Sequence, residues 1–550
     1  MRGNFDNSVS LIRFILRRER VISAVWVVLL VLFSAGLAPG INGMFPDDAS
    51  RSQFALSYDN PVMISMMGPA YGIENYTPGA MYTGMMLLWV AITACVMNIF
   101  FVVRHTRADE ERGRVEVVRS LPTGRLANLN ATMVSAVIIN AVIALLIGFG
   151  LAAAGIESMD LAGGMLFGAL VGLAGLVFAA LAALFSQLSS SAGGAMGMSF
   201  LALGGLYLLR GAGDMQGSDA ISCISPLGLI LRSQAYIQNR LWPVFILVLE
   251  VIIISAAAYK LNSIRDMDQG FIAAKPGRKE AKPGLLSPLG LAYRLMRTML
   301  IAWIITMLML GASYGSVIGE IGSFVGDSPE YLTVIGIPPE IADGMTDADK
   351  QDIISSYFGL FVNSIMALIC IVPLLNAAMK PRSEEREGRS EHVLSRVVSR
   401  VKYLAGYISI SYAASVLFPI ATALGLYSSV AAVSGDSIPP SFELGSLLKA
   451  NLAYLPAMWV IIGAAVLAVG LFPKASGAIW GYYGFICFAA LFGNLPDLLP
   501  EWISKLSPMS YIPRFPLDDI SFAPLAVLAL IAAALTAIGF VSYARRDYRP

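Results

Sequence analysis

Apolar runs of 18 or more residues recur along this chain and constrain its fold more than any other feature. Residues 81–103 and 522–543 are two such runs, and each is long enough to cross a bilayer as a helix. Only 14% of the 550 residues are charged, compared with about 25% in a soluble protein. Strands of a membrane β-barrel would instead alternate between apolar and polar residues over about ten positions. The sequence therefore predicts an all-α polytopic membrane protein.

Twelve runs are predicted to span the membrane, six in each half of the chain. The predicted spans are 21–38, 81–103, 129–154, 161–185, 192–209, 241–259, 299–318, 353–377, 404–429, 448–471, 476–495 and 523–543. Lysine and arginine collect in the segments 104–127, 260–297 and 380–402, whereas the loops 39–80 and 319–352 are acidic. Because lysine and arginine mark the cytoplasmic side, we expect both termini in the cytoplasm and both acidic loops outside.

The two halves are predicted to be copies of one another. Residues 109–120 read DEERGRVEVVRS, and residues 384–395 read EEREGRSEHVLS. Seven identities share an offset of 275 residues: Glu110, Gly113, Arg114, Glu116, Val118, Ser120 and Arg125 match Glu385, Gly388, Arg389, Glu391, Val393, Ser395 and Arg400. Since each half has an even number of spans, the halves share one orientation, as in a parallel repeat about the membrane normal. The predicted organisation is a first half at 1–272, a linker at 273–286 and a second half at 287–550.

Weaker similarities extend the duplication beyond the charged stretches. Trp26 and Trp303 occupy corresponding places, and ISPLG (224–228) is similar to LSPMS (506–510). Residues 8–20 mix apolar positions with arginines on one helical face. This pattern predicts an interfacial helix before the first span, and residues 287–297 predict one in the second half. The alternative is that both segments are plain flanks that obey the positive-inside rule.

Two charged segments, residues 104–127 and 380–402, follow the second span of each half. A lipid surface would attract their lysines and arginines but repel their glutamates. Charges of both signs suit a protein partner with complementary charges, and two copies suit a dimeric partner. The alternative is that both segments are solvated loops that only obey the positive-inside rule.

Several motifs resemble segments of a known family of ABC exporter permeases. They are YDNPVMISMMGPAYGIENYTPGAMY (58–82), RHTRADEERGRVEVVRSLPTGR (104–125), LFSQLSSSAGGA (184–195), SPLGLAYRLMR (287–297) and RSEEREGRSEHVLSRVVSR (382–400). The family is described as exporting polyketide antibiotics and includes tetracycline-resistance members. The resemblance runs over most of the chain. It implies a type-two ABC exporter permease-like fold with two fused six-helix halves, in a bacterial plasma membrane.

The resemblance also implies a partner and a substrate class. Each charged segment would carry a coupling helix that docks on a separately encoded ATPase subunit, acting as a homodimer with ATP and Mg²⁺ bound on that subunit. The residues expected to couple are Glu110, Glu111, Gly113, Arg114, Glu116, Arg125, Glu384, Glu385, Gly388, Arg389, Glu391 and Arg400. Val397 stands where the first copy has Pro122, so we expect the two docking contacts to be unequal. The transported compounds would be amphipathic drugs or lipid-like molecules.

No sequence motif indicates a catalytic, nucleotide-binding or metal site in this chain. The phosphate-loop pattern GxxxxGK[ST] is absent, and the dipeptide Gly-Lys never occurs, so the chain lacks that ATP cradle. The only histidines, His105 and His392, lie in the charged segments and are predicted to be solvated rather than ligands. We expect no catalytic residue, no metal, no cofactor and no nucleic-acid partner.

One carboxylate lies deep inside a predicted span. Glu250 is about midway along 241–259, where an ionised acid is costly and should face the interior, find a partner or be protonated. The functional interpretation is a contact with cationic or hydrogen-bonding substrates, and the structural one is helix packing. Asn98, Asn140 and Asn363 are further candidates for a substrate path, or else hydrogen-bond donors between helices.

Two other classes of protein remain open at this point. A secondary transporter of the major facilitator kind, coupled to protons, also has twelve spans in two parallel halves. The acidic outer loops and the length of the charged segments argue against it. A membrane-embedded lipid-modifying enzyme would need an acid or metal cluster, and the loops contain none that stands out.

Overall fold

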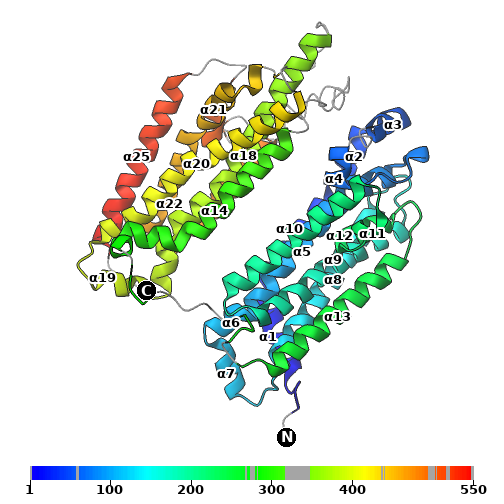
Figure 1. Cartoon of the computed structure of the whole chain (residues 1–550), viewed down its shortest axis with the longest axis horizontal. Helices are drawn as coiled ribbons and strands as arrows, with labels where there is room; N and C mark the ends of the chain where they lie inside the picture. Colours follow the sequence, from blue (N-terminus) through cyan, green and yellow to red (C-terminus); the bar gives the residue numbers. More distant parts are fainter. Residues whose placement is uncertain are drawn as a thin grey trace. The chain divides into compact units, whose positions relative to one another are not determined.

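A computed structural model of the chain describes residues 3–56, 61–266, 269–272, 279–281, 283–315, 347–434, 440–492, 505–513 and 521–546, together with positions 438, 502 and 515. It divides into two compact units, Met1–Gly277 and Arg278–Pro550, shown in Figure 1 and described one at a time. All regular structure in the described residues is helical. Half of the linker 273–286 and most of the acidic loop 319–352 lie outside the described residues.

Eleven helices in the described part are long and apolar enough to cross a membrane. They are Ser8–Met44, Pro78–Glu111, Ala127–Ala153, Leu161–Leu188, Ala192–Met215, Trp242–Ile264, Pro288–Gly315, Ser356–Arg386, Arg400–Ala432, Leu444–Leu471 and Phe522–Arg545. Each contains one of the predicted spans or most of it. The remaining predicted span, 476–495, forms a shorter apolar helix, α23 (Ala478–Phe492), and its last three residues lie outside the described part. The prediction of an all-α polytopic membrane protein is confirmed.

The first unit is built around two buried helices. Its long helices are α1 (Ser8–Val31), continued by a π-helical turn (Leu32–Gly36) and α2 (Ala38–Met44), then α5 (Pro78–His105), α8 (Ala127–Ala153), α9 (Leu161–Leu188), α10 (Ala192–Met215) and α13 (Trp242–Ile264). The central helices α5 and α9 pack against each other, while α8 and α13 also pack on α9. Glycine allows the closest approach, because a Cβ added at Gly168 of α9 would lie 2.1 Å from the carbonyl oxygen of Ala144 on α8.

Short helices lie at the two ends of the first unit. They are α3 (Asp48–Leu56), α4 (Pro61–Met67), a 3₁₀ turn (Ile73–Asn75), α6 (Arg107–Glu111), α7 (Arg114–Ser120), α11 (Asp219–Ser222) and α12 (Pro226–Arg232). Figure 1 shows α6 and α7 at one end of the long helices and α2, α3 and α11 at the other. The first charged segment and the acidic loop 39–80 therefore lie at opposite ends of the unit.

The second unit has a similar series of helices. They are a 3₁₀ turn (Pro283–Leu286), α14 (Pro288–Gly315), α18 (Asp347–Arg386), α19 (Arg389–Leu394), α20 (Arg400–Ser434), a 3₁₀ turn (Pro440–Phe442), α21 (Leu444–Leu452), α22 (Leu455–Leu471), α23, a 3₁₀ turn (Pro508–Tyr511) and α25 (Phe522–Arg545). The closest pairs are α14 with α20 and α22 with α25. Glycine again sits at a contact, since a Cβ at Gly425 would lie 2.1 Å from the Leu308 carbonyl oxygen.

One predicted element takes a different form. Residues 8–20 do not make a separate interfacial helix, because α1 runs without a break from Ser8 to Val31. No glycine or proline interrupts the backbone hydrogen bonds over this stretch. Arg13, Arg17 and Arg20 are exposed, whereas Ile15 and Glu19 are buried on another face.

The weak repeat ISPLG/LSPMS has one local geometry in both units. Ser225 accepts a hydrogen bond from the backbone N–H of Leu227, and Ser507 accepts one from that of Met509. In each case the serine caps a short helix that begins with proline, where the missing N–H costs nothing.

Candidate coupling site

A left-handed glycine divides each charged segment into two helical pieces. Gly113 (φ +68°) separates α6 from α7, and Gly388 (φ +71°) separates α18 from α19. Glycine takes this conformation without the steric penalty that a side chain imposes. The duplicated glycine therefore places a short helix, α7 or α19, beyond the end of the second long helix of each unit.

Glu110 ties the first charged segment to the sixth long helix. Its carboxylate is buried and accepts a hydrogen bond of 2.7 Å from Arg265, the C-cap residue of α13. Arg107 makes a second ion pair with it at 3.1 Å. Arg125, just before α8, donates to the Arg265 carbonyl oxygen at 2.8 Å. The second, third and sixth long helices thus meet at one buried acid.

Glu385 makes the same set of contacts in the second unit. Its carboxylate pairs with Arg546, which is the C-cap residue of α25. Arg382 lies 3.5 Å away and has the sequence position that corresponds to Arg107. Arg400, at the start of α20, donates to the Arg546 carbonyl oxygen at 2.5 Å. We name these two arrangements the Glu110 brace and the Glu385 brace.

A second duplicated ion pair holds each short helix against its long helix. Arg114 donates to Asp109 at 2.9 Å, and Arg389 donates to Glu384 at 2.7 and 2.9 Å. The hydrogen bonds to Glu384 raise the pKa of Arg389 above its ordinary value, although desolvation opposes them. Each pair spans the left-handed glycine, so it fixes the angle at which the short helix leaves the long one.

The predicted coupling residues fall into two groups. Glu110, Glu384 and Glu385 are buried in pairs within the chain. Glu116 and Glu391 are exposed on α7 and α19. The acids of the first group therefore pair with arginines of this chain, and their role in coupling stays a prediction. For Glu110 and Glu385 the sequence pattern could not reveal the paired arginine, which lies 155 and 161 residues away. The arginine that pairs with Glu384 is five residues away.

The outer surface of the short helices carries apolar side chains beside these charges. Val117 is 67% exposed and Leu121 is also exposed, next to Glu116. Val397 is fully exposed just after α19. Glu111 is exposed but accepts a hydrogen bond of 2.8 Å from the Ala192 backbone N–H at the start of α10. The exposed surface in the first unit is a small apolar patch with a charged rim.

Three of the four candidates for a substrate path are amides that hydrogen-bond within their own unit. Asn98 of α5 and Asn140 of α8 form a reciprocal amide pair, at 3.0 and 2.8 Å, with both side chains buried. Asn363 accepts a hydrogen bond of 3.1 Å from Asn451 in the second unit. Glu250 lies on α13, which packs on α9, and its Oε2 atom is buried with no hydrogen-bond partner in the described part. The amides connect helices, and only Glu250 keeps an unused polar atom.

Two features escaped the sequence reasoning. His105 is not solvated but buried, with Nε2 3.2 Å from Glu19 Oε1, whereas His392 is exposed. At the other end of the unit, Asp214 of α10 is buried between Arg210 and Arg232, at 3.0 and 3.1 Å.

The sequence contains a signal for the ion cluster at Asp214. Arg210 and Asp214 are spaced i,i+4 at the end of an apolar helix, which is the spacing of a helical ion pair. Arg210 also donates to the carbonyl oxygens of Ser65 and Met66. The cluster therefore joins α4, α10 and α12 by buried charges.

Long apolar helices with duplicated networks of ion pairs define a multi-pass membrane protein. The comparisons with known proteins agree. The chain belongs to the family described as multidrug efflux system permease Rv1217c, C-terminal domain, whose sequence model matches residues 11–260 and 285–544. It is similar to the multidrug efflux system permease protein Rv1217c of Mycobacterium tuberculosis (strain ATCC 25618 / H37Rv), with 31% identity over 563 aligned residues. That alignment covers 100% of this chain and 96% of the relative.

Proposed function

We propose that the chain is the permease subunit of an ATP-driven ABC exporter that moves amphipathic compounds out of the cell. Its twelve helices would form two fused parallel six-helix repeats, with both termini in the cytoplasm. ATP and Mg²⁺ would bind to a separate ATPase subunit acting as a dimer. The name of the relative, a multidrug efflux permease, supports the transported class, and the chain itself would be no enzyme.

The observation that carries this proposal is the pair of matching braces. Glu110 with Arg265, and Glu385 with Arg546, each hold a short helix beyond the second long helix of a unit. A brace that connects three long helices transmits a displacement of the short helix to all of them, because packed elements move as rigid bodies. Two such sites suit a partner with two equivalent surfaces, such as a dimeric ATPase.

The exposed patch on α7 supports a docking role. Val117 and Leu121 are exposed apolar side chains, and Glu116 lies beside them. A small apolar centre with charges at its rim is a common composition of protein–protein contacts. The proposal therefore assigns docking to the exposed side chains and transmission to the buried acids.

Reconstitution tests the proposal. The permease in nanodiscs is mixed with each candidate ATPase subunit, and ATP hydrolysis is measured with and without amphipathic drugs. We expect one subunit to co-purify and to show drug-stimulated hydrolysis. Export from cells that depends on the proton gradient rather than on ATP would instead favour a secondary transporter.

A further inference from the structure

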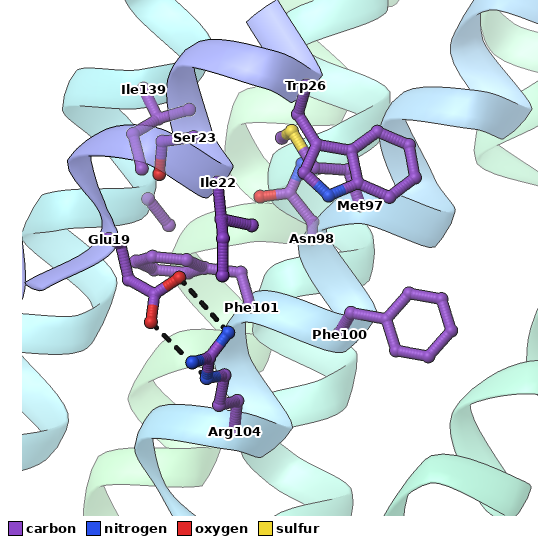
Figure 2. A pocket seen from close by; sticks show the side chains of 11 residues that line it. Glu19, Ile22, Ser23, Trp26, Met97, Asn98, Phe100, Phe101, Arg104 and Ile139 are labelled. Atoms are coloured by element: carbon purple, nitrogen blue, oxygen red, sulfur yellow. Dashed lines mark hydrogen bonds and ion pairs between the residues drawn. The ribbon is translucent and has the colours of Figure 1, made fainter. Parts of the chain in front are cut away.

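A hollow in the first unit combines a buried carboxylate with aromatic walls. It has a volume of about 50 Å³ and lies between α1, α5 and α8. Its lining consists of Glu19, Ile22, Ser23, Trp26, Met97, Asn98, Phe100, Phe101, Arg104, Ala136 and Ile139. Figure 2 shows Glu19 and Arg104 pointing toward each other, with Ile22 beside them and Trp26 next to Met97 farther along.

The carboxylate at this hollow is deeply buried but loosely held. Glu19 is 2% exposed, and its contacts with Arg104 and His105 measure 3.2–3.3 Å. Its Oε1 atom has no hydrogen bond in the described part of the chain. The side chain of Arg104 is 41% exposed. A carboxylate buried in the protein interior needs a cationic partner. The partner here, Arg104, is partly exposed, so its side chain can turn away from Glu19 into solvent.

The fold of a six-helix half does not require a carboxylate at the position of Glu19. When Trp26 is aligned with Trp303, the residue that corresponds to Glu19 is Met296. The charged segments are offset by 275 residues, and at that offset the residue that corresponds to Arg104 is Met379. Both methionines pack in the hydrophobic core of the second unit. The second half therefore replaces the ion pair by two apolar side chains, and the first half keeps a costly buried charge that its counterpart does without.

We propose that this hollow binds the cationic group of an amphipathic organic cation, whose charge replaces Arg104 at Glu19. The rings of Trp26 and Phe101 line the same hollow and attract a cation through their faces. The hollow holds only the charged group, so the apolar part of the ligand lies along the exposed side chains of Ile22 and Phe100. The inference rests on the proposed function for its direction of transport and names the substrate class.

Equilibrium binding of dansylcadaverine, a fluorophore with a primary ammonium group at the end of a flexible chain, to the purified permease tests this site. The full chain is placed in nanodiscs without an ATPase subunit, fluorescence polarisation is recorded, and empty nanodiscs give the background. Glu19→Gln should weaken binding about tenfold, the effect of losing about 1.4 kcal/mol. Arg104→Met should tighten it several-fold, because it removes the competing cation. Glu157→Gln, an exposed acid at the other end of the unit, should leave binding unchanged.

The double variant Glu19→Met/Arg104→Met guards against loss of folding. It introduces the pair that the second half already tolerates, so it should fold and lose saturable dansylcadaverine binding. Wild-type affinity in this variant, unchanged affinity in Glu19→Gln, or no saturable binding by the wild type would overturn the inference. Failure of the proposed function has a different signature, since ATP hydrolysis would then be absent in reconstitution while these binding ratios would stay the same.

Discussion

Glu110→Gln should destabilise the permease far more than an ordinary substitution of a charged residue. The wild-type carboxylate is buried and paired with Arg265 at 2.7 Å and with Arg107 at 3.1 Å. Removing one member of a buried pair costs about 3–5 kcal/mol, because the remaining charges are left uncompensated. Glutamine still accepts one hydrogen bond, so we expect about 3 kcal/mol, which is on the order of a hundredfold in the unfolding equilibrium.

The free energy of unfolding is measured by SDS titration in mixed micelles. The double variant Glu110→Gln/Arg265→Gln should be less destabilised than the sum of its single variants, because neither charge is then left alone. Glu157→Gln is the matched control and should change the free energy by less than about 0.5 kcal/mol. Equal stability of Glu110→Gln and Glu157→Gln would refute the description of Glu110 as a buried brace.

Three further predictions concern other parts of the chain. Asn363→Ala should lower the free energy of unfolding by about 1 kcal/mol, typical of interhelical hydrogen bonds in membranes, because it removes the bond from Asn451, and leave the drug profile unchanged; a changed drug profile at equal expression would return Asn363 to the substrate path. Glu250→Leu should raise the unfolding temperature, because it removes a buried oxygen that has no hydrogen-bond partner in the described part; a lower temperature would show that Glu250 has a partner. A cysteine in place of Asp48, whose side chain is almost fully exposed, should react with an impermeant thiol reagent in whole cells lacking other cysteines; labelling only after lysis would reverse the proposed orientation.

The sequence predicted the elements of this fold well because membrane spans are long and uniform. The family resemblance predicted a helix in each charged segment, and the structure has a short helix, α7 or α19, in each of them. The ion-pair partners of the buried acids were harder to predict, because the residue that pairs with Glu110 lies at the far end of α13. Only the folded arrangement of helices brings Arg265 to it, and the same holds for Glu385 and Arg546.

The hollow at Glu19 shows a second limit of prediction from sequence. In the sequence, Glu19 lies among arginines at the start of a span, which is typical of a cytoplasmic flank. The helix turns Arg17 and Arg20 outward and Glu19 inward, because residues on opposite faces of one turn have different surroundings. A single acid in a basic flank therefore marked an unusual position in the sequence. Its burial could not be predicted, because it results from the packing of α1 against α5 and α8.

Photo-crosslinking from the two short helices tests the central claim most directly. A photoreactive amino acid is placed at Val117 or at Val397, both of which are exposed, and the permease is combined with its ATPase subunit in nanodiscs. The proposed coupling predicts crosslinks to the ATPase from both positions, and none from a position at the other end of the first unit such as Glu157. Absence of a crosslink from both short helices, in a complex that hydrolyses ATP in response to drugs, would contradict the claim that the duplicated charged segments couple the two subunits.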